Sequence, residues 1–175
     1  LLYGREEILK KLPNQNHQFL EGSYPYTINP GGPNHEELVS LIGIYEYMMA
    51  LHKHHFDNED TEIRIKISQV NNLISKHEEE VANPILDYIS SREDLKLIGK
   101  NKIENKNRAP TISIVNQKIS SKQMSKILVD NNIATRNDNF YAWRCLEALN
   151  INTDDGLVRL SLTHYNNAKD TEKVI

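Results

Sequence analysis

The chain has 175 residues, 26% of them charged and 38% hydrophobic, with a formal net charge of -3. This charge balance gives no clustered basic face of the kind that nucleic-acid-binding proteins carry. No apolar run approaches the roughly 20 residues that span a bilayer. The single cysteine cannot form an internal disulfide, so we expect a reducing, cytoplasmic location.

The chain opens with LLYGREEILKKLP, without Met and without a signal-peptide pattern. Leu1 to Tyr3 resembles the end of an apolar strand, and a short charged helix is expected from Gly4 to Leu12, before Pro13. We therefore expect that the sequence was cut from a longer chain, inside a folded unit. The following segment, up to Asn34, is rich in Gly, Pro and Asn, which is typical of loops.

A long helix is predicted after this loop. Asn34 is a good N-cap, with Glu37 three residues later, and the helix is expected to run to about Phe56. Its apolar positions recur at steps of three and four residues: Leu38, Leu41, Ile42, Tyr45, Met48 and Met49. A second helical stretch begins near Thr61 and continues past Pro84, which should kink it or start a new helix.

Strands and helices alternate in the remainder of the chain. Strands are predicted at DLKLIGK, PTISIVN, IATR and GLVRLSLTHY, and helices at SSKQMSKILVDNN, NFYAWRCLEAL and NAKDTEKVI. This mixture predicts an α/β fold in which a short mixed or antiparallel sheet is packed with helices, preceded by a long connecting helix.

Two arginines on predicted strands are candidates for binding an anion. Alternation places Arg159 in mid-strand on a largely polar face, where its guanidinium can bind a carboxylate as a fork. Arg136 ends the preceding strand, at a place where α/β folds collect binding residues. The alternative for Arg159 is a structural ion pair on an exposed strand face, and for Arg136 a solvated strand end.

The segment NPGGPNHEE combines Gly31 and Gly32 with a helix start, where free N–H groups attract anions. The same residues are also ordinary turn chemistry. His52 and His55 lie one helical turn apart, but two histidines satisfy little of what a metal site needs, so no metal site is predicted.

The lone cysteine, Cys145, lies in the predicted helix NFYAWRCLEAL. Helical spacing groups it with Ala142, Leu146 and Leu149 on a buried face, where a thiol is inert. Tyr141 lies one turn earlier, near the helix start, and is better placed to face a cleft.

These segments, in this order, resemble the C-terminal part of the class V aminotransferase family, whose members are fold type I pyridoxal-phosphate enzymes and include the cysteine desulfurases. The resemblance is carried by LLYGREEILKKLP, NPGGPNHEEL, RAPTISIVN, NNIATRNDNFYAW and GLVRLSLTHYNNAKD. It implies that residues 1–33 are a remnant of the large cofactor-binding domain. Residues 34–60 would be a connecting helix, and residues 61–175 a small C-terminal α/β domain.

The resemblance also implies roles for particular residues. Arg159 matches the arginine that binds the substrate carboxylate, and Arg136 matches a second active-site arginine. Gly31 and Gly32 match a Gly-Thr pair that reaches the cofactor phosphate of the partner subunit, so a homodimer is expected. Tyr141 takes the place of the nucleophilic cysteine of desulfurases, and a phenol cannot form a persulfide. Persulfide chemistry at Cys145 is the alternative.

The lysine and the acidic residue that hold pyridoxal phosphate are expected upstream of Leu1. The full-length protein is therefore predicted to use pyridoxal phosphate on an amino acid or related amine, whereas this segment alone is expected to bind no cofactor and to be inactive. The competing hypothesis is a non-catalytic binding or interaction domain that keeps the fold without the cofactor.

Overall fold

The computed structural model describes residues 4–22, 26–29, 31–57 and 61–175. The chain divides into two units, Leu1–Ile67 and Ser68–Ile175. The strand end expected at Leu1 to Tyr3 lies outside the described residues. The domain boundaries proposed after residues 33 and 60 stay predictions.

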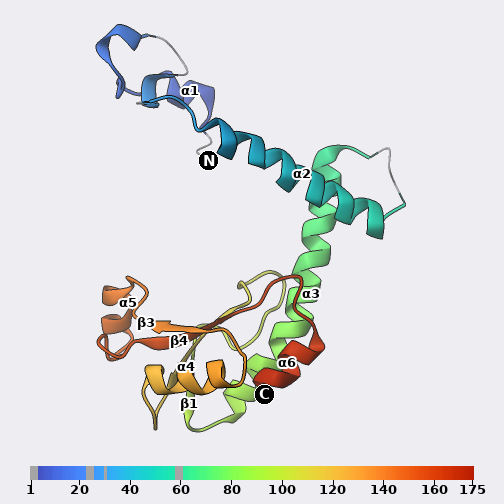
Figure 1. Ribbon diagram of the computed structural model, residues 1–175, viewed down its shortest axis with the longest axis vertical. Coiled ribbons are helices and arrows are strands. Elements are labelled where there is room, and N and C mark those ends of the chain that lie inside the picture. Colours follow the sequence, from blue (N-terminus) through green and yellow to red (C-terminus); the bar gives the residue numbers. More distant parts are fainter. Residues whose placement is uncertain (1–3, 23–25, 30, 58–60) are drawn as a thin grey trace. The chain divides into compact units, whose positions relative to one another are not determined.

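The first unit consists of short helical turns followed by one long helix (Figure 1). Helix α1 covers Glu6–Leu9, which is shorter than predicted, and 3-10 turns follow at Gln18–Leu20 and Tyr26–Ile28. The side chain of Asn16 ties this loop together, because its Nδ2 donates to the carbonyl oxygens of Tyr26 and Asn29.

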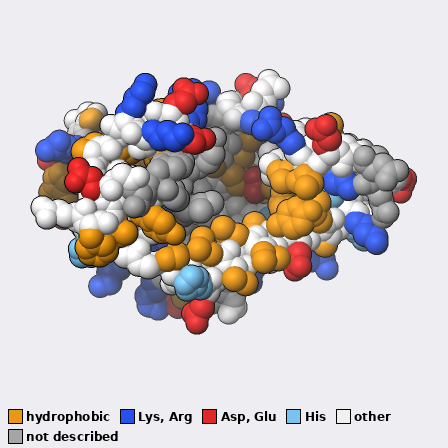
Figure 2. Space-filling view, turned by 90° about the horizontal axis from the view of Figure 1, so that it is seen from above, with side chains coloured by type: hydrophobic (Ala, Val, Ile, Leu, Met, Phe, Trp, Pro, Cys, Tyr) orange, Lys and Arg blue, Asp and Glu red, His pale blue; other side chains and the backbone are white. Residues whose placement is uncertain are grey.

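Helix α2, His35–His55, begins and ends where the sequence predicts. The Asn34 side chain caps it by accepting the N–H of Glu37 at 3.0 Å, and Phe56 follows the last residue. Most of the apolar side chains along α2 are exposed, and Figure 2 shows hydrophobic side chains lying on the surface among charged ones. The predicted apolar stripe is therefore largely uncovered.

Helix α3, Ile63–Ser91, continues through Pro84. Of the two outcomes expected there, a kink or a new helix start, the new start does not occur. Pro84 is exposed, whereas its neighbours Ile85 and Leu86 are completely buried. Asn83 adds a second anchor, because its side chain accepts the N–H of Ile103 and donates to the same residue's carbonyl. We infer that this burial offsets the roughly 3 kcal/mol that a proline costs inside a helix.

The second unit contains a four-stranded sheet in the order β1-β2-β4-β3, and every neighbouring pair is antiparallel. The strands are β1 Leu95–Ile98, β2 Thr111–Asn116, β3 Arg136–Asp138 and β4 Leu157–Ser161, and the helices after β1 are α4 Ser121–Asp130, α5 Trp143–Ala148 and α6 Ala168–Val174. In the described part of the chain, no helix is long and apolar enough to cross a membrane.

The main core lies on one face of this sheet, against α3. It contains Ala82, Ile85, Leu86, Ile89, Ile103, Ile112, Ile114 and Leu160, with side chains of α4 and α6 packed around it. Because alternate residues of a strand point to opposite faces, the side chains of Ser113 and Arg159 point away from this core.

A second, smaller cluster lies on the opposite face. Leu146 of α5, Ile151 and Leu157 are buried together, with Phe140 packed against them. It covers only one end of that face, since Ser161 at the other end of β4 is exposed.

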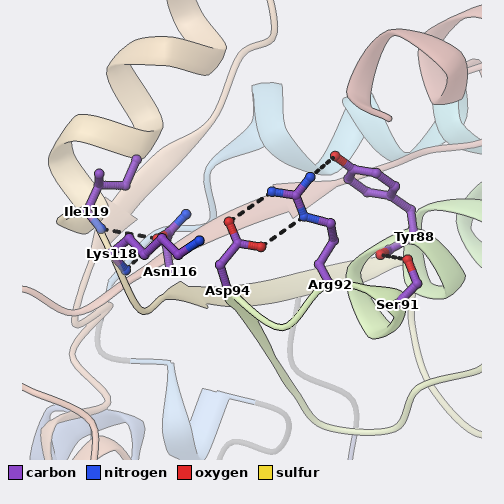
Figure 3. A network of polar contacts seen from close by, with 7 residues as sticks. All are labelled: Tyr88, Ser91, Arg92, Asp94, Asn116, Lys118 and Ile119. Carbon is purple, nitrogen blue, oxygen red and sulfur yellow. Dashed lines mark hydrogen bonds and ion pairs between the residues drawn. The ribbon is translucent and has the colours of Figure 1, made fainter.

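Polar contacts span the turn between the end of α3 and the start of β1 (Figure 3). The Arg92 guanidinium donates to both carboxylate oxygens of Asp94, at 2.9 Å each, and approaches the Tyr88 hydroxyl at 3.5 Å. The Asp94 carbonyl accepts the N–H of Gln117 at 2.9 Å, just after β2. This fork fixes the turn between the long helix and the sheet.

Candidate functional site

The two arginines singled out in the sequence lie directly opposite each other. Arg136 of β3 pairs with Arg159 of β4, and Arg159 pairs on its other side with Ser113 of β2. Opposed residues of neighbouring antiparallel strands share a face, with Cβ atoms roughly 4.5–5.5 Å apart. The sheet therefore places two guanidinium groups and a hydroxyl in one row, on the face away from the main core.

Neither arginine has an acidic partner among the described residues. The ion pairs found there join other residues, and no hydrogen bond is formed by either guanidinium. Arg136 is exposed and Arg159 is half-buried. Two like charges at opposed positions repel each other, so this row is an arrangement suited to an anion.

The Arg159 guanidinium lies over an aromatic ring. Its central carbon is 4.3 Å from the centroid of the Phe140 ring, well within the range of a cation–π contact. Phe140 was expected at the start of a helix, and its contact with Arg159 was missed. The signal that could have found it is the pair Asp138 and Asn139, which favours a turn before the helix.

The backbone is strained where it presents Phe140. Phe140 and Tyr141 have φ values of 53° and 59°, in the left-handed region that bulky residues avoid. Each such residue costs about 1–3 kcal/mol and persists only when its surroundings hold it. Here Asn139 holds the turn, because its side chain accepts the N–H of Tyr141 at 3.1 Å and its carbonyl accepts that of Ala142 at 2.9 Å.

Gly156 allows the start of β4 to approach the end of β3. Its φ is +69°, and a Cβ at this position would lie 2.3 Å from the backbone carbon and oxygen of Asp138. Only glycine avoids both problems. This contact keeps the strand that carries Arg136, and the turn that carries Phe140, close to β4.

Helix α4 fixes β3 from the core side through buried polar groups. Ser121 is buried, and its N–H donates to the Asp155 carboxylate at 3.0 and 3.1 Å. Asn137 of β3 donates to the Ser121 hydroxyl at 3.1 Å, and Ser125 bonds Thr135 at 3.0 Å. Arg136 therefore lies on a strand whose other face is anchored.

Tyr141 and Cys145 follow β3 in the chain, Tyr141 in the left-handed turn and Cys145 in helix α5. Tyr141 is fully exposed, next to the Phe140 ring that contacts Arg159. The expectation that Cys145 belongs to the core is wrong, since Cys145 is exposed and only Leu146 of that predicted face is buried. Helix α5 begins at Trp143, after the left-handed turn, so the helical spacing assumed from Phe140 onward does not apply.

Gly31 and Gly32 belong to the other unit, so they are described by themselves. They line a shallow pocket with Asn16, His17, Leu20, Tyr26, Asn29 and Pro33. A Cβ at either glycine would meet open space. Among the described residues, no group of three or more His, Cys, Asp or Glu side chains could hold a metal ion.

The comparisons with known proteins bear on both units. The profile of the family described as Aminotransferase class-V matches residues 64–174. The aminotransferase-like protein FGM3 of Gibberella zeae is 24% identical over 179 aligned residues, which cover 100% of this chain and 40% of FGM3. The chain thus spans about two fifths of the length of this curated relative.

One solved cysteine desulfurase shares the fold over most of this chain. CsdA of Escherichia coli, in its S-sulfonic acid form, superimposes with a TM-score of 0.59 at 17% identity, over 86% of this chain and 31% of CsdA. The enzyme of Thermococcus onnurineus NA1 gives a TM-score of 0.49 at 20% identity, over 63% of this chain and 27% of that one. The likeness to CsdA confirms the predicted α/β fold, a long helix followed by an antiparallel sheet with helices.

Enzymes of the class V family depend on pyridoxal phosphate and bind amino-acid substrates. The cofactor needs a lysine amine, an acid for the ring nitrogen and donors for the phosphate. The described lining of the Gly31–Gly32 pocket includes no lysine and no acid, and neither glycine is required there by a close contact. The residues described in this pocket do not by themselves fit the cofactor.

Proposed function

Because the chain belongs to the aminotransferase class-V family, we propose that it provides the substrate-carboxylate site of a pyridoxal-phosphate-dependent enzyme that acts on an amino acid or related amine. The observation that carries this proposal is the Arg136–Arg159 row, two opposed guanidinium groups without an acidic partner among the described residues. A carboxylate placed against this row would relieve the repulsion and accept charge-assisted hydrogen bonds.

In this proposal the residues of the row have unequal roles. Arg159, half-buried and in the middle of the sheet, binds the carboxylate as a two-pronged fork. Arg136, exposed on the edge strand, adds positive potential and a further donor. Tyr141 extends from the strained turn beside them and contacts the remainder of the substrate. When bound, pyridoxal phosphate supplies the electron sink of the reaction.

The proposal extends to the assembly and its location. Gly31 and Gly32 would contact the cofactor phosphate of a partner subunit through backbone N–H groups, which makes the enzyme a homodimer. The lysine and acid that hold the cofactor would come from outside the residues described here. We propose a cytoplasmic location, in keeping with the single cysteine.

The test measures carboxylate binding directly. The purified chain, labelled with ¹⁵N-arginine, is titrated with propionate, and propionamide serves as the uncharged control. We expect saturable shifts of the Arg159 Nε–H resonance with propionate alone. Arg159→Ala should weaken binding by at least about tenfold, because a hydrogen bond to a charged group contributes roughly 1.5–3 kcal/mol.

A matched control is Lys96→Ala, which removes a charge from the exposed part of β1, where Lys96 pairs with Val115 instead of an arginine. This variant should bind propionate like the parent chain. If Arg159→Ala and Lys96→Ala reduce binding equally, only general charge attraction is being measured, and the carboxylate site is wrongly assigned.

A second candidate is a binding or interaction domain that keeps the fold without the cofactor. Neither candidate requires a lysine or an acid in the described lining of the Gly31–Gly32 pocket, so this lining does not separate them. Equilibrium dialysis with pyridoxal phosphate separates the two candidates, if it is performed on a longer protein that contains this chain. Retention that depends on a lysine outside this chain supports the enzyme, and no retention supports the binding domain.

A further inference from the structure

Arg159 lacks the kind of partner that usually orders a strand arginine. Its guanidinium has no ion pair or hydrogen bond among the described residues. The contact it does make is with the Phe140 ring, at 4.3 Å from the central carbon to the ring centroid. Arg136, its opposed neighbour, makes no ring contact within the described part of the chain. Among the described residues, the Arg159 guanidinium is thus held by an aromatic ring, whereas the Arg136 guanidinium is not.

The Phe140 ring is itself held from two sides. It packs against the buried cluster of Leu146, Ile151 and Leu157. Its backbone is fixed in a left-handed turn by the hydrogen bonds of Asn139. A ring that is fixed in this way is a rigid support, whereas an arginine side chain alone would sample many rotamers.

Resting on the proposed function, we propose that Phe140 is a positioning residue for Arg159. The ring supports one flat side of the guanidinium, and the N–H groups, which lie in the guanidinium plane, remain open to a carboxylate. Phe140 does not contact the substrate in this proposal. It raises affinity because the arginine loses less conformational freedom when the carboxylate binds.

This role explains why the strain at Phe140 and Tyr141 is maintained. If a helix began at Phe140, the Phe140 ring would lie on the helix surface and would be directed away from Arg159. The left-handed turn instead directs the ring to β4, where it contacts both Leu157's cluster and Arg159. Backbone strain of this kind is concentrated at binding sites, where the surrounding structure maintains it.

The experiment uses the ¹⁵N-arginine-labelled chain and two substitutions, Phe140→Leu and Phe140→Tyr. Leucine keeps an apolar side chain on the cluster but removes the ring, whereas tyrosine keeps the ring. In the parent chain and in Phe140→Tyr, ring current should shift the Arg159 Nε–H resonance away from that of Arg136. In Phe140→Leu the shift should disappear, and propionate should bind about two- to fivefold more weakly, as expected for a partly exposed cation–π contact.

Val115→Ala is the structural control, since Val115 packs in the same small cluster on β2. It should leave the Arg159 resonance and propionate affinity unchanged. If Val115→Ala weakens binding as much as Phe140→Leu does, or if Phe140→Tyr fails to restore it, Phe140 acts only through packing and the positioning role is wrong.

The outcome also distinguishes this proposal from the one on which it rests. If Arg159→Ala loses propionate binding while Phe140→Leu retains full affinity, the carboxylate site stands and the role of Phe140 is overturned. If Arg159→Ala binds propionate like the parent chain, the carboxylate site itself is wrong.

Discussion

At the scale of single residues, the Arg136–Arg159 pair works against stability. Like charges directly opposite each other on neighbouring strands destabilise a sheet, whereas favourable cross-strand pairs each contribute roughly 0.2–1 kcal/mol. No carboxylate among the described residues pairs with either arginine to offset this repulsion. Unfavourable local interactions are expected at binding and catalytic sites. This pair therefore indicates a binding site rather than an interaction that stabilises the fold.

A first prediction follows for Arg136→Gln, which removes one of the two opposed charges. We expect the free energy of unfolding at low salt to rise by roughly 0.2–1 kcal/mol, with a smaller gain at high salt because ions screen the repulsion. Urea unfolding followed by circular dichroism at two salt concentrations measures this. Lys96→Gln, opposite Val115, is the control and should not stabilise the chain. A loss of stability in Arg136→Gln would contradict the repulsion.

A second prediction concerns Gly156. Alanine there must adopt a φ of +69° and place its Cβ 2.3 Å from the Asp138 backbone, which cannot move as a side chain could. We expect Gly156→Ala to lower the free energy of unfolding by about 3 kcal/mol or more, in the range typical of backbone strain combined with overpacking. Chemical denaturation gives the value.

Gly99→Ala separates the two causes, because Gly99 also has a positive φ, +99°, but has open space around the position of a Cβ. The free energy of unfolding of Gly99→Ala should fall by only about 1–2 kcal/mol, the cost of the left-handed backbone conformation alone. Equal losses in the two variants would show that the contact with Asp138 does not restrict the approach of β3 to β4.

At the scale of elements, one forked ion pair, Arg92 with Asp94, spans the turn between α3 and β1. Hydrogen bonds from the Arg92 guanidinium hold the pKa of Asp94 below its usual value. A carboxylate with a lowered pKa in the folded state stabilises it at every pH above the unfolded pKa. That contribution is lost as the pH falls through the folded pKa.

We therefore predict that Asp94→Asn is less stable than the parent chain at neutral pH and that the difference shrinks as the solution is acidified. Urea unfolding at a series of pH values from about 7 to about 3 covers the range in which carboxylates titrate. The control is Glu93→Gln, because Glu93 is an exposed neighbour without an ion pair in the described structure. Its free energy of unfolding should differ from that of the parent chain by the same amount at every pH. A pH-independent difference in Asp94→Asn would argue against the ion pair.

The sequence predicted the order of these elements because the signals were local. The Asn34 cap, the β-branched residues of β2 and the alternation in β4 each specify a conformation without distant partners. Alternation also placed Arg159 on the face away from the main core. What it could not supply was the partner of Arg159 across the strand, because register depends on distant contacts.

The errors occurred where tertiary contacts override local preference. Pro84 normally ends a helix, but the buried side chains around it keep α3 continuous. Cys145 falls on a helical stripe only if the helix starts at Phe140, and the left-handed turn there shortens the helix to Trp143–Ala148. The Phe140–Arg159 contact is missed for the same reason, since the turn determines where the ring points.

At the scale of the whole molecule, α2 exposes more apolar surface than a helix in water usually does. Seven large apolar side chains along it are exposed, Leu38, Val39, Leu41, Ile42, Ile44, Tyr45 and Tyr47. They lie on more than one side of the helix, so no single polar face remains to keep it solvated. Contiguous apolar surface of this kind marks sites of protein association.

The last prediction is that the 175-residue chain self-associates through α2. Val39 and Ile42, 63% and 56% exposed, lie one helical turn apart on the same side of the helix. Sedimentation velocity over a range of concentrations should show larger species as concentration rises, because association removes this surface from water. The double substitution Val39→Glu and Ile42→Glu should shift the distribution toward the monomer. Val129→Glu, which replaces a residue of α4 that is 52% exposed, should not shift the distribution. A monodisperse monomer at every concentration would show that the apolar surface of α2 does not drive association of this chain.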